Sequence, residues 1–212
     1  MMNQSHDLAE ELKKAVSGEV RFDDFSKVLY STDASIYQME PIGVVIPRAK
    51  DDVIATIDVA RKSNIPILPR GAGTSLAGQS VNHAIVIDFT KHMDHVLEIN
   101  TEERWARVQP GVILDQLNRI LKPHGLQYAP DPSTSNRASI GGGIGNNSCG
   151  SHSVVYGKTS DHVIGVDVVL ADGTEAWFSS IKRSELEKKL AGATLENEIY
   201  RQVIFTKIII QS

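Results

Sequence analysis

This 212-residue sequence has little of what would assign it to several common classes of protein. Cys149 is its only cysteine, so an internal disulfide cannot form and a disulfide-stabilised fold is excluded. It contains no run of about 18 apolar residues, so no transmembrane segment is expected. Lysine and arginine form no cluster and the net charge is −4, so nothing indicates a nucleic-acid partner.

The composition is otherwise that of an ordinary globular protein, with 41% apolar and 23% charged residues. The length suits one domain built of two lobes. Residues 1–16 are polar and acidic, unlike a secretory signal peptide. We therefore expect a cytoplasmic protein, and peripheral contact with a membrane through a partner stays open.

Glycine is concentrated in two segments, which are the most informative part of the sequence. Five of the ten residues of 141–150 are glycine, and Asn146 and Asn147 lie among them. The other segment, 69–78, reads Pro-Arg-Gly-Ala-Gly-Thr-Ser-Leu-Ala-Gly. Such segments lose much backbone entropy on folding, and they suit sites where backbone N–H groups hold an anion. Two of them predict a large nucleotide cofactor held from two sides, while the asparagines either reach a polar ring edge or adopt left-handed backbone.

Neither segment fits the two standard phosphate-binding fingerprints. The glycine spacing of 73–80 is that of a triphosphate-binding P-loop, but Gln79 stands where a lysine must reach the terminal phosphates. The dinucleotide fingerprint also fails, because Leu76 and Ser148 occupy the position of its third glycine. What remains is a cofactor held by backbone donors from two lobes, with merely flexible loops as the plain alternative.

Apolar periodicity predicts both helices and strands. Helices are expected at 5–17, at about 51–62 and between 112 and Gly125, while 184–204 is either a helix or a broken pair. Strands are expected at 44–47, 65–68, 84–88, 163–170 and 175–178, with a hairpin formed by 96–99 and 105–109. Residues 19–40 are expected to be irregular, and Trp105 and Trp177 to lie in the core.

Five motifs in a fixed order carry a resemblance to a known protein family. They are the segment 69–78, Pro-Asp-Pro-Ser at 130–133, Ile-Gly-Gly-Gly-Ile-Gly-Asn-Asn-Ser-Cys-Gly at 140–150, Tyr-Gly-Lys-Thr at 156–159 and Val-Val-Leu-Ala-Asp-Gly at 168–173. Over about residues 20–204, the set resembles the FAD-binding domain of the vanillyl-alcohol oxidase/p-cresol methylhydroxylase (PCMH-type) flavoproteins. It is most similar to their glycolate oxidase D-subunit and D-lactate dehydrogenase branch, including long members with a C-terminal iron–sulfur module.

The resemblance implies an α+β, two-lobed PCMH-type fold with FAD extended between the lobes. The expected parts are a lead-in at 1–40, an FAD-binding domain at 41–204 with lobes of about 41–100 and 101–204, and a divergent tail at 205–212. The residues expected to wrap the pyrophosphate are Arg70, Gly71, Ala72, Gly73, Thr74 and Ser75, with Gly78 and Gln79 closing that loop. Those expected on the flavin and ribityl side are Pro130, Asp131, Gly141, Gly142, Gly145, Asn146 and Gly150, with Ile164 near the adenine. Some relatives attach flavin covalently to a histidine at the position of Thr74, so non-covalent FAD is expected here.

The resemblance also implies a flavin-dependent oxidoreductase that oxidises a D-2-hydroxy acid such as lactate, glycolate or 2-hydroxyglutarate. Family members continue into a cap domain that carries the catalytic residues, whereas this sequence stops at Ser212. We therefore expect a shortened or frameshifted product with no complete substrate site. The alternatives are a truncated FAD- or nucleotide-binding module without turnover, completion by a separate chain carrying the cap or iron–sulfur module, and a relative of the nucleotide-sugar reductases.

A few other polar residues carry weaker signals. His92 and His95 flank an aspartate, but without a third ligand nearby they are interpreted as solvated loop histidines rather than a metal site. Cys149 is interpreted as a small residue packed beneath the flavin rather than a redox group. His152 and His162 have either a cofactor contact or an ordinary hydrogen-bonding role.

Overall fold

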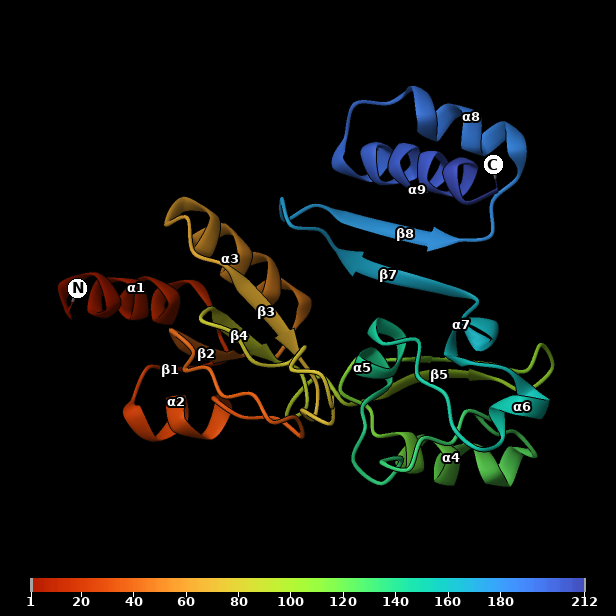
Figure 1. The fold of residues 1–212 in the computed structure, drawn as a ribbon, viewed down its shortest axis with the longest axis horizontal. Coiled ribbons are helices and arrows are strands. Elements are labelled where there is room, and N and C mark those ends of the chain that lie inside the picture. The colour runs from red at the N-terminus through yellow and green to blue at the C-terminus, as the bar shows by residue number, and fades with distance from the viewer. Residues whose placement is uncertain (1, 212) are drawn as a thin grey trace. The chain divides into compact units, whose positions relative to one another are not determined.

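The computed structural model describes residues 2–211, and it divides after Val163 into two compact units (Figure 1). Met1 of the expected lead-in and Ser212 of the expected tail lie outside the described residues. Helices and strands both contribute throughout, so the expected α+β class is confirmed. Within residues 2–211, no helix is long and apolar enough to cross a membrane.

The first unit begins with a four-stranded sheet and its helices. Their bounds are α1 Met2–Ala15, β1 Glu19–Arg21, α2 Asp24–Tyr30, β2 Gly43–Ile46, α3 Lys50–Lys62, β3 Ile67–Arg70 and β4 Ile85–Asp88. The strand order is β1-β2-β4-β3, in which β4 runs parallel to both β2 and β3 and β1 runs antiparallel to β2. Every residue of β2 and β4 is buried, as expected for central strands whose sequences are almost continuously apolar.

Both faces of this sheet are covered. On one face, Leu8 and Leu12 of α1 form a buried cluster with Val59 of α3 and with Val45 and Ile85 of the sheet. On the other face, the buried strand residues Val44, Ile46 and Val86 pack with Tyr30 of α2 and with Leu68. The helices packed on the two faces hold the sheet in place, and the first glycine-rich segment begins at the end of its strand β3.

The expectation that residues 19–40 are irregular is wrong. β1 pairs with β2 through the register Val20 to Val45, and α2 begins after Asp23. The Asp23 side chain accepts a hydrogen bond of 2.9 Å from the backbone N–H of Ser26, which is an N-cap interaction. A three-residue strand is too short to show a period. The seven-residue helix gave no amphipathic signal because apolar Phe25 and its neighbours on α2 are exposed.

The rest of the first unit is a hairpin with short helices. It comprises β5 Val96–Asn100, β6 Trp105–Val108, α4 Leu114–Leu121, a 3₁₀ turn at Lys122–His124, α5 Ile140–Gly145, α6 Ser153–Tyr156 and α7 Thr159–His162. β5 and β6 are antiparallel. Their inward side chains pack on a buried cluster formed by Val112, Leu114, Leu117 and Leu121 of the α4 region and by Ile140 of α5. The core therefore anchors the beginning of the second glycine-rich segment.

The second unit contains β7 Gly165–Val169, β8 Glu175–Ser179, α8 Arg183–Ala191 and α9 Leu195–Gln211. The two expected strands β7 and β8 pair antiparallel as a hairpin, with Gly173 at a positive φ of 84° in its turn. Residues 184–204 were expected to form either one helix or a broken pair, and the structure has two helices there, α8 and α9. Trp177 lies in β8 but is 48% exposed, so its expected place in the core is wrong.

Candidate functional site

The first glycine-rich segment leaves the carboxyl end of β3 as a loop, residues 71–79. Gly73 and Gly78 have positive φ angles of 67° and 79°, in the left-handed region that glycine adopts at little cost. Within the part of the chain that the structure describes, no residue accepts a hydrogen bond from a backbone N–H of this loop. These donors are therefore available to a ligand that offers several acceptor oxygens.

Arg70, the last residue of β3, was expected to bind phosphate, but its guanidinium is engaged with the protein. Its Nη1 donates to the carbonyl oxygens of Ser80 (2.8 Å) and Tyr30 (3.2 Å), and its Nη2 donates to that of Thr32 (2.8 Å). The guanidinium also lies over the Tyr30 ring, 5.3 Å from its centroid. In this structure, Arg70 joins the 71–79 loop to the end of α2.

The second glycine-rich segment was not among the expected helices, but its first half is the helix α5. The Ser139 side chain accepts a bond of 3.4 Å from the N–H of Gly142, and the Gly143 N–H donates to the Ser139 carbonyl at 2.9 Å. Gly141 is packed so closely on Pro110 that an added Cβ would lie 2.7 Å from the proline Cβ. The N-cap and this tight packing explain how a glycine run, which disfavours helix, stays helical.

The two glycine-rich segments meet within the first unit. A Cβ added to Gly71 would lie 2.1 Å from the Ser139 hydroxyl oxygen and 3.9 Å from the Gly142 Cα. Glycine at position 71 lets the loop approach α5 without displacing the Ser139 side chain. This close approach brings the expected pyrophosphate residues beside the expected flavin residues.

Gly145 and the asparagines after it end α5 at an open surface. A Cβ added to Gly145 would meet no protein atom within 4 Å, so packing does not explain the glycine. Asn147 has a positive φ of 46° and its side chain accepts from the N–H of Ser160 at 2.9 Å, which supports the left-handed backbone role for this residue. Asn146 has an ordinary φ of −92° and is exposed.

The residues after α5 pack against the 130–133 motif. An added Cβ at Gly150 would lie 2.0 Å from the Asp131 carbonyl oxygen, and the adjacent Pro130 is buried. The Asp131 carboxylate accepts bonds from the His152 N–H (2.8 Å) and the Ser151 hydroxyl (2.7 Å). These bonds, with the His152 N–H first, hold the pKa of Asp131 below its usual value. The carboxylate thus orders the chain beyond Gly150.

The histidines flagged in the sequence have hydrogen-bonding roles. His92 is half-buried, and its Nε2 lies 3.0 Å from the Glu19 carboxylate. The interpretation of His92 as a solvated histidine is therefore wrong. His152 Nδ1 lies 3.0 Å from the Asp131 carboxylate, and His162 Nε2 lies 2.8 Å from the Tyr156 carbonyl oxygen. Within residues 2–211, no group of three or more metal-ligating side chains is positioned to hold an ion. Cys149 is exposed, and its thiol is free.

Ile164, expected near the adenine, is the first residue of the second unit. It precedes β7 rather than lying in it and is 66% exposed. Its proposed contact with the cofactor stays a prediction.

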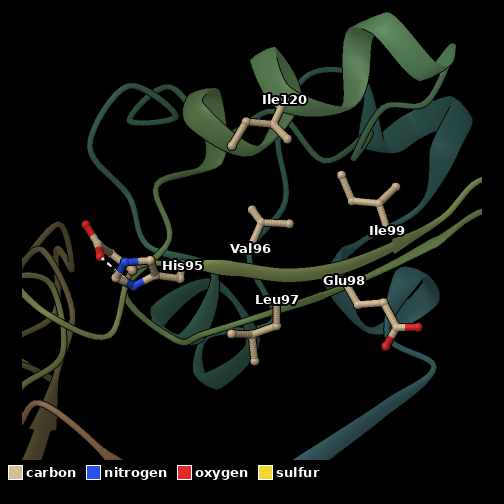
Figure 2. A pocket seen from close by; sticks show the side chains of 7 residues that line it. His95, Val96, Leu97, Glu98, Ile99 and Ile120 are labelled. Atoms are coloured by element: carbon tan, nitrogen blue, oxygen red, sulfur yellow. Dashed lines mark ion pairs between the residues drawn. The ribbon is translucent and has the colours of Figure 1, made fainter.

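The described residues also line a surface hollow of about 500 Å³ beside β5 (Figure 2). Figure 2 shows Val96 and Ile99 on the side of the strand that faces Ile120, with His95 at one end of the hollow. The His95 Nδ1 lies 3.3 Å from an Asp94 carboxylate oxygen. Neither glycine-rich segment contributes to the lining. The hollow is open and mostly apolar, so it does not compete with the glycine segments as a site for a phosphate-bearing cofactor.

Sequence reasoning missed several residues that shape the candidate site. They are Tyr30, Thr32, Asp33, Ser80 and Ser139. Tyr30 and Thr32 accept hydrogen bonds through backbone carbonyl oxygens, which leave no trace in residue type, and the Tyr30 ring adds a contact with the Arg70 guanidinium. A serine just before a glycine run is a recognisable N-cap signal, so Ser139 was the one that the sequence offered.

The geometry fits an extended ligand that carries phosphate groups. The 71–79 loop offers free backbone donors, Gly145 leaves room for a ligand atom at the end of α5, and no metal-ligand cluster occurs in the described residues. Neutral backbone donors suit a pyrophosphate, whose charge they stabilise by several hydrogen bonds at once. Fold and site together define a nucleotide-cofactor-binding domain.

Comparison with known proteins identifies the cofactor. Residues 41–179 match the family described as FAD binding domain. The D-2-hydroxyglutarate dehydrogenase of Pantoea ananatis (strain AJ13355) is 45% identical over 177 residues, which are 82% of this chain and 17% of that protein. The glycolate oxidase subunit GlcD of Bacillus subtilis (strain 168) is 42% identical over 163 residues, 74% of this chain and 34% of that protein. A structure of p-cresol methylhydroxylase with substrate bound matches with a TM-score of 0.73 at 19% identity, over 84% of this chain and 36% of that one.

The chain belongs to the FAD binding domain family. The expected family resemblance and PCMH-type fold are thereby confirmed. The chain spans about a sixth of the length of the D-2-hydroxyglutarate dehydrogenase and about a third of that of the glycolate oxidase subunit.

Proposed function

We propose that this chain is the FAD-binding part of a flavin-dependent oxidoreductase that oxidises a D-2-hydroxy acid. The observation that carries the binding proposal is the loop of free backbone N–H donors, 71–79, packed against α5 at Gly71. The substrate class rests on the relatives, which are named for D-2-hydroxyglutarate and glycolate.

The residues proposed to hold FAD fall into two groups. The pyrophosphate group contacts the 71–79 loop, through the backbone of Gly71, Ala72 and Gly73, the hydroxyls of Thr74 and Ser75, and the closing Gly78 and Gln79. The flavin and ribityl group lies against Pro130, Asp131, Gly141, Gly142, Gly145, Asn146 and Gly150, and the adenine lies near Ile164. Hydroxyl and amide groups of this kind bind phosphate and polar ring edges without a covalent bond.

Non-covalent binding is proposed because Thr74 replaces the histidine that carries the covalent flavin link in some relatives. Trichloroacetic acid precipitation tests this directly. All flavin should remain in the supernatant, whereas yellow colour in the washed pellet would contradict the proposal.

When bound, FAD supplies an acceptor for the hydride of the substrate's α-carbon. The described residues of this chain bind and orient the cofactor. The residue that removes the hydroxyl proton is proposed to lie outside the FAD-binding region. No catalytic residue is therefore proposed among the described residues. A separate chain that carries a cap or an iron–sulfur module is the proposed partner.

Anaerobic mixing tests the proposed substrate class. The FAD-loaded chain is mixed with D-lactate, glycolate or D-2-hydroxyglutarate, and loss of flavin absorbance near 450 nm is followed, with the L-enantiomers of the chiral acids as controls. Reduction by a D-acid supports an enzyme that is complete for the reductive half-reaction.

A second candidate function is an FAD-binding module without turnover of its own, which the free backbone donors of the 71–79 loop support equally. In that case, dithionite reduces the bound flavin but none of the acids does. Failure to bind FAD at all would contradict both candidates.

A further inference from the structure

The segment 30–37 precedes the region matched by the family and makes repeated contacts with the 71–79 loop and its flanks. Its first contact is Arg70, whose guanidinium donates to the carbonyl oxygens of Tyr30 and Thr32 on this segment and to that of Ser80 at the far end of the loop. One side chain thereby joins both ends of the loop to the segment.

Three further contacts connect the same two parts of the chain. The Asp33 carboxylate accepts from the Ser80 hydroxyl at 2.8 Å, and the Ala34 N–H donates to the Gly73 carbonyl oxygen at 3.0 Å. The Tyr37 ring packs on Gly78, where an added Cβ would lie 2.7 Å from a ring carbon. The loop is therefore held at its start, its middle and its end.

The segment that holds the loop is itself ordered. Thr32 and Gln38 form an antiparallel bridge, and the Met39 N–H donates to the carbonyl oxygen of the buried Ser31 at 2.8 Å. The segment can thus serve as a rigid support for a loop whose own N–H groups have no partner among the described residues.

Arg70 is suited to this role because its bonds go to neutral carbonyl oxygens. The planar guanidinium reaches three acceptors at once, which a lysine ammonium on a flexible stem does not reproduce. Burial lowers the pKa of Arg70, and the nearby Asp88 opposes that shift. Arginine remains protonated at neutral pH, so all of its donors are retained.

We infer that Arg70 and Asp33 are positioning residues, which shape the 71–79 loop for the cofactor's pyrophosphate by fastening it to the segment 30–37. This inference rests on the proposed FAD site and changes the expected role of Arg70 from phosphate ligand to loop support. It also makes 30–37 part of the cofactor site, although the segment lies outside the matched region.

Two variants of the full chain separate positioning from direct charge attraction. R70K keeps the positive charge but loses the three-way hydrogen bonding, and D33A removes a negative charge together with the bond to Ser80. Charge attraction alone predicts that R70K binds FAD normally and that D33A binds it more tightly. Positioning predicts that both bind FAD at least tenfold more weakly. R61K and D58A, which alter an exposed ion pair on α3, are the matched controls.

Riboflavin distinguishes a displaced loop from a general loss of structure, because it has the flavin but no pyrophosphate. A general loss of structure would weaken the binding of riboflavin as well as that of FAD. Its dissociation constant should be unchanged in R70K and D33A while that of FAD rises. Normal FAD affinity in R70K, or tighter FAD binding in D33A, would overturn the inference. If R70K does not fold, D33A and S80A decide the matter, since S80A removes the other side of the Asp33 bond.

NMR of the apo chain labelled with ¹⁵N-glycine keeps this test separate from the test of FAD binding. The amide signals of Gly71, Gly73 and Gly78 should move in D33A and R70K, while that of Gly125 stays in place. Unmoved loop signals would refute the positioning role, whatever the chain binds. If the wild-type chain binds no FAD but the loop signals move, the proposed function fails and the structural role of Arg70 stands.

Discussion

Replacing Gly145 by alanine tests whether a cofactor approaches the end of α5. In the structure, the added Cβ meets no protein atom within 4 Å, and the backbone of Gly145 is helical rather than left-handed. Alanine favours helix over glycine by up to about 1 kcal/mol. The apo G145A chain should therefore be as stable as the wild type, or more stable by up to that amount.

FAD binding should respond in the opposite direction. If the cofactor packs on the Gly145 backbone, the new methyl group occupies space that ligand atoms need, and we expect at least a tenfold loss of affinity, about 1.4 kcal/mol. Gly143→Ala is the matched control. It lies in the same helix, its added Cβ makes only ordinary contacts of 3.9 Å with Ser148, and it is not among the proposed cofactor residues.

Urea denaturation measures the stability of the apo variants, and quenching of flavin fluorescence measures the dissociation constant for FAD. The expected pattern is normal or raised stability in both variants, with weakened FAD binding in G145A alone. Equal FAD affinity in wild type and G145A would refute the reasoning. Equal weakening in both variants would show that the helix, rather than its glycine surface, governs binding.

Three further predictions concern stability. Gly150→Ala places a Cβ 2.0 Å from a backbone carbonyl oxygen that cannot rotate away, so it should destabilise the fold by about 1–3 kcal/mol in urea titrations; a neutral result would contradict the tight packing. Ser139→Ala should cost about 1 kcal/mol through loss of the α5 cap, and it should relieve part of the cost of Gly71→Ala, so that additive effects in the double mutant would speak against their contact. Hydrogen bonds from Lys91, Arg21 and His92 lower the pKa of Glu19 to about 2, so Glu19 stabilises the fold above its unfolded pKa of about 4.3 and loses that contribution as the pH falls toward 2. Glu19→Gln should therefore be destabilised more at pH 6 than at pH 2, and an equal loss at both would show that the ionised carboxylate is not the cause.

Much of the fold could be predicted because its elements carry strong patterns. β4 is a continuous apolar run between turn residues, and α3 has an apolar stripe with acidic residues at its start and basic residues at its end. These signals are local, so a single sequence reveals them. β1 and α2 were missed because one is very short and the other leaves apolar side chains exposed.

The candidate site could be located but not fully described from the sequence. Glycine density identified both segments, yet glycine's low helix propensity concealed that 140–145 is a helix stabilised by Ser139. The role of Arg70 was also beyond sequence reasoning. Its hydrogen-bond acceptors are backbone carbonyl oxygens from other parts of the chain, and no residue type indicates such a bond.

The most direct test is titration of the purified apo chain with FAD, with riboflavin titrated in parallel. The proposed site predicts saturable one-to-one binding of FAD, and a clearly weaker affinity for riboflavin because the 71–79 loop then has no pyrophosphate to bind. Absence of saturable FAD binding, or equal affinity for FAD and riboflavin, would contradict the assignment of that loop as the pyrophosphate site.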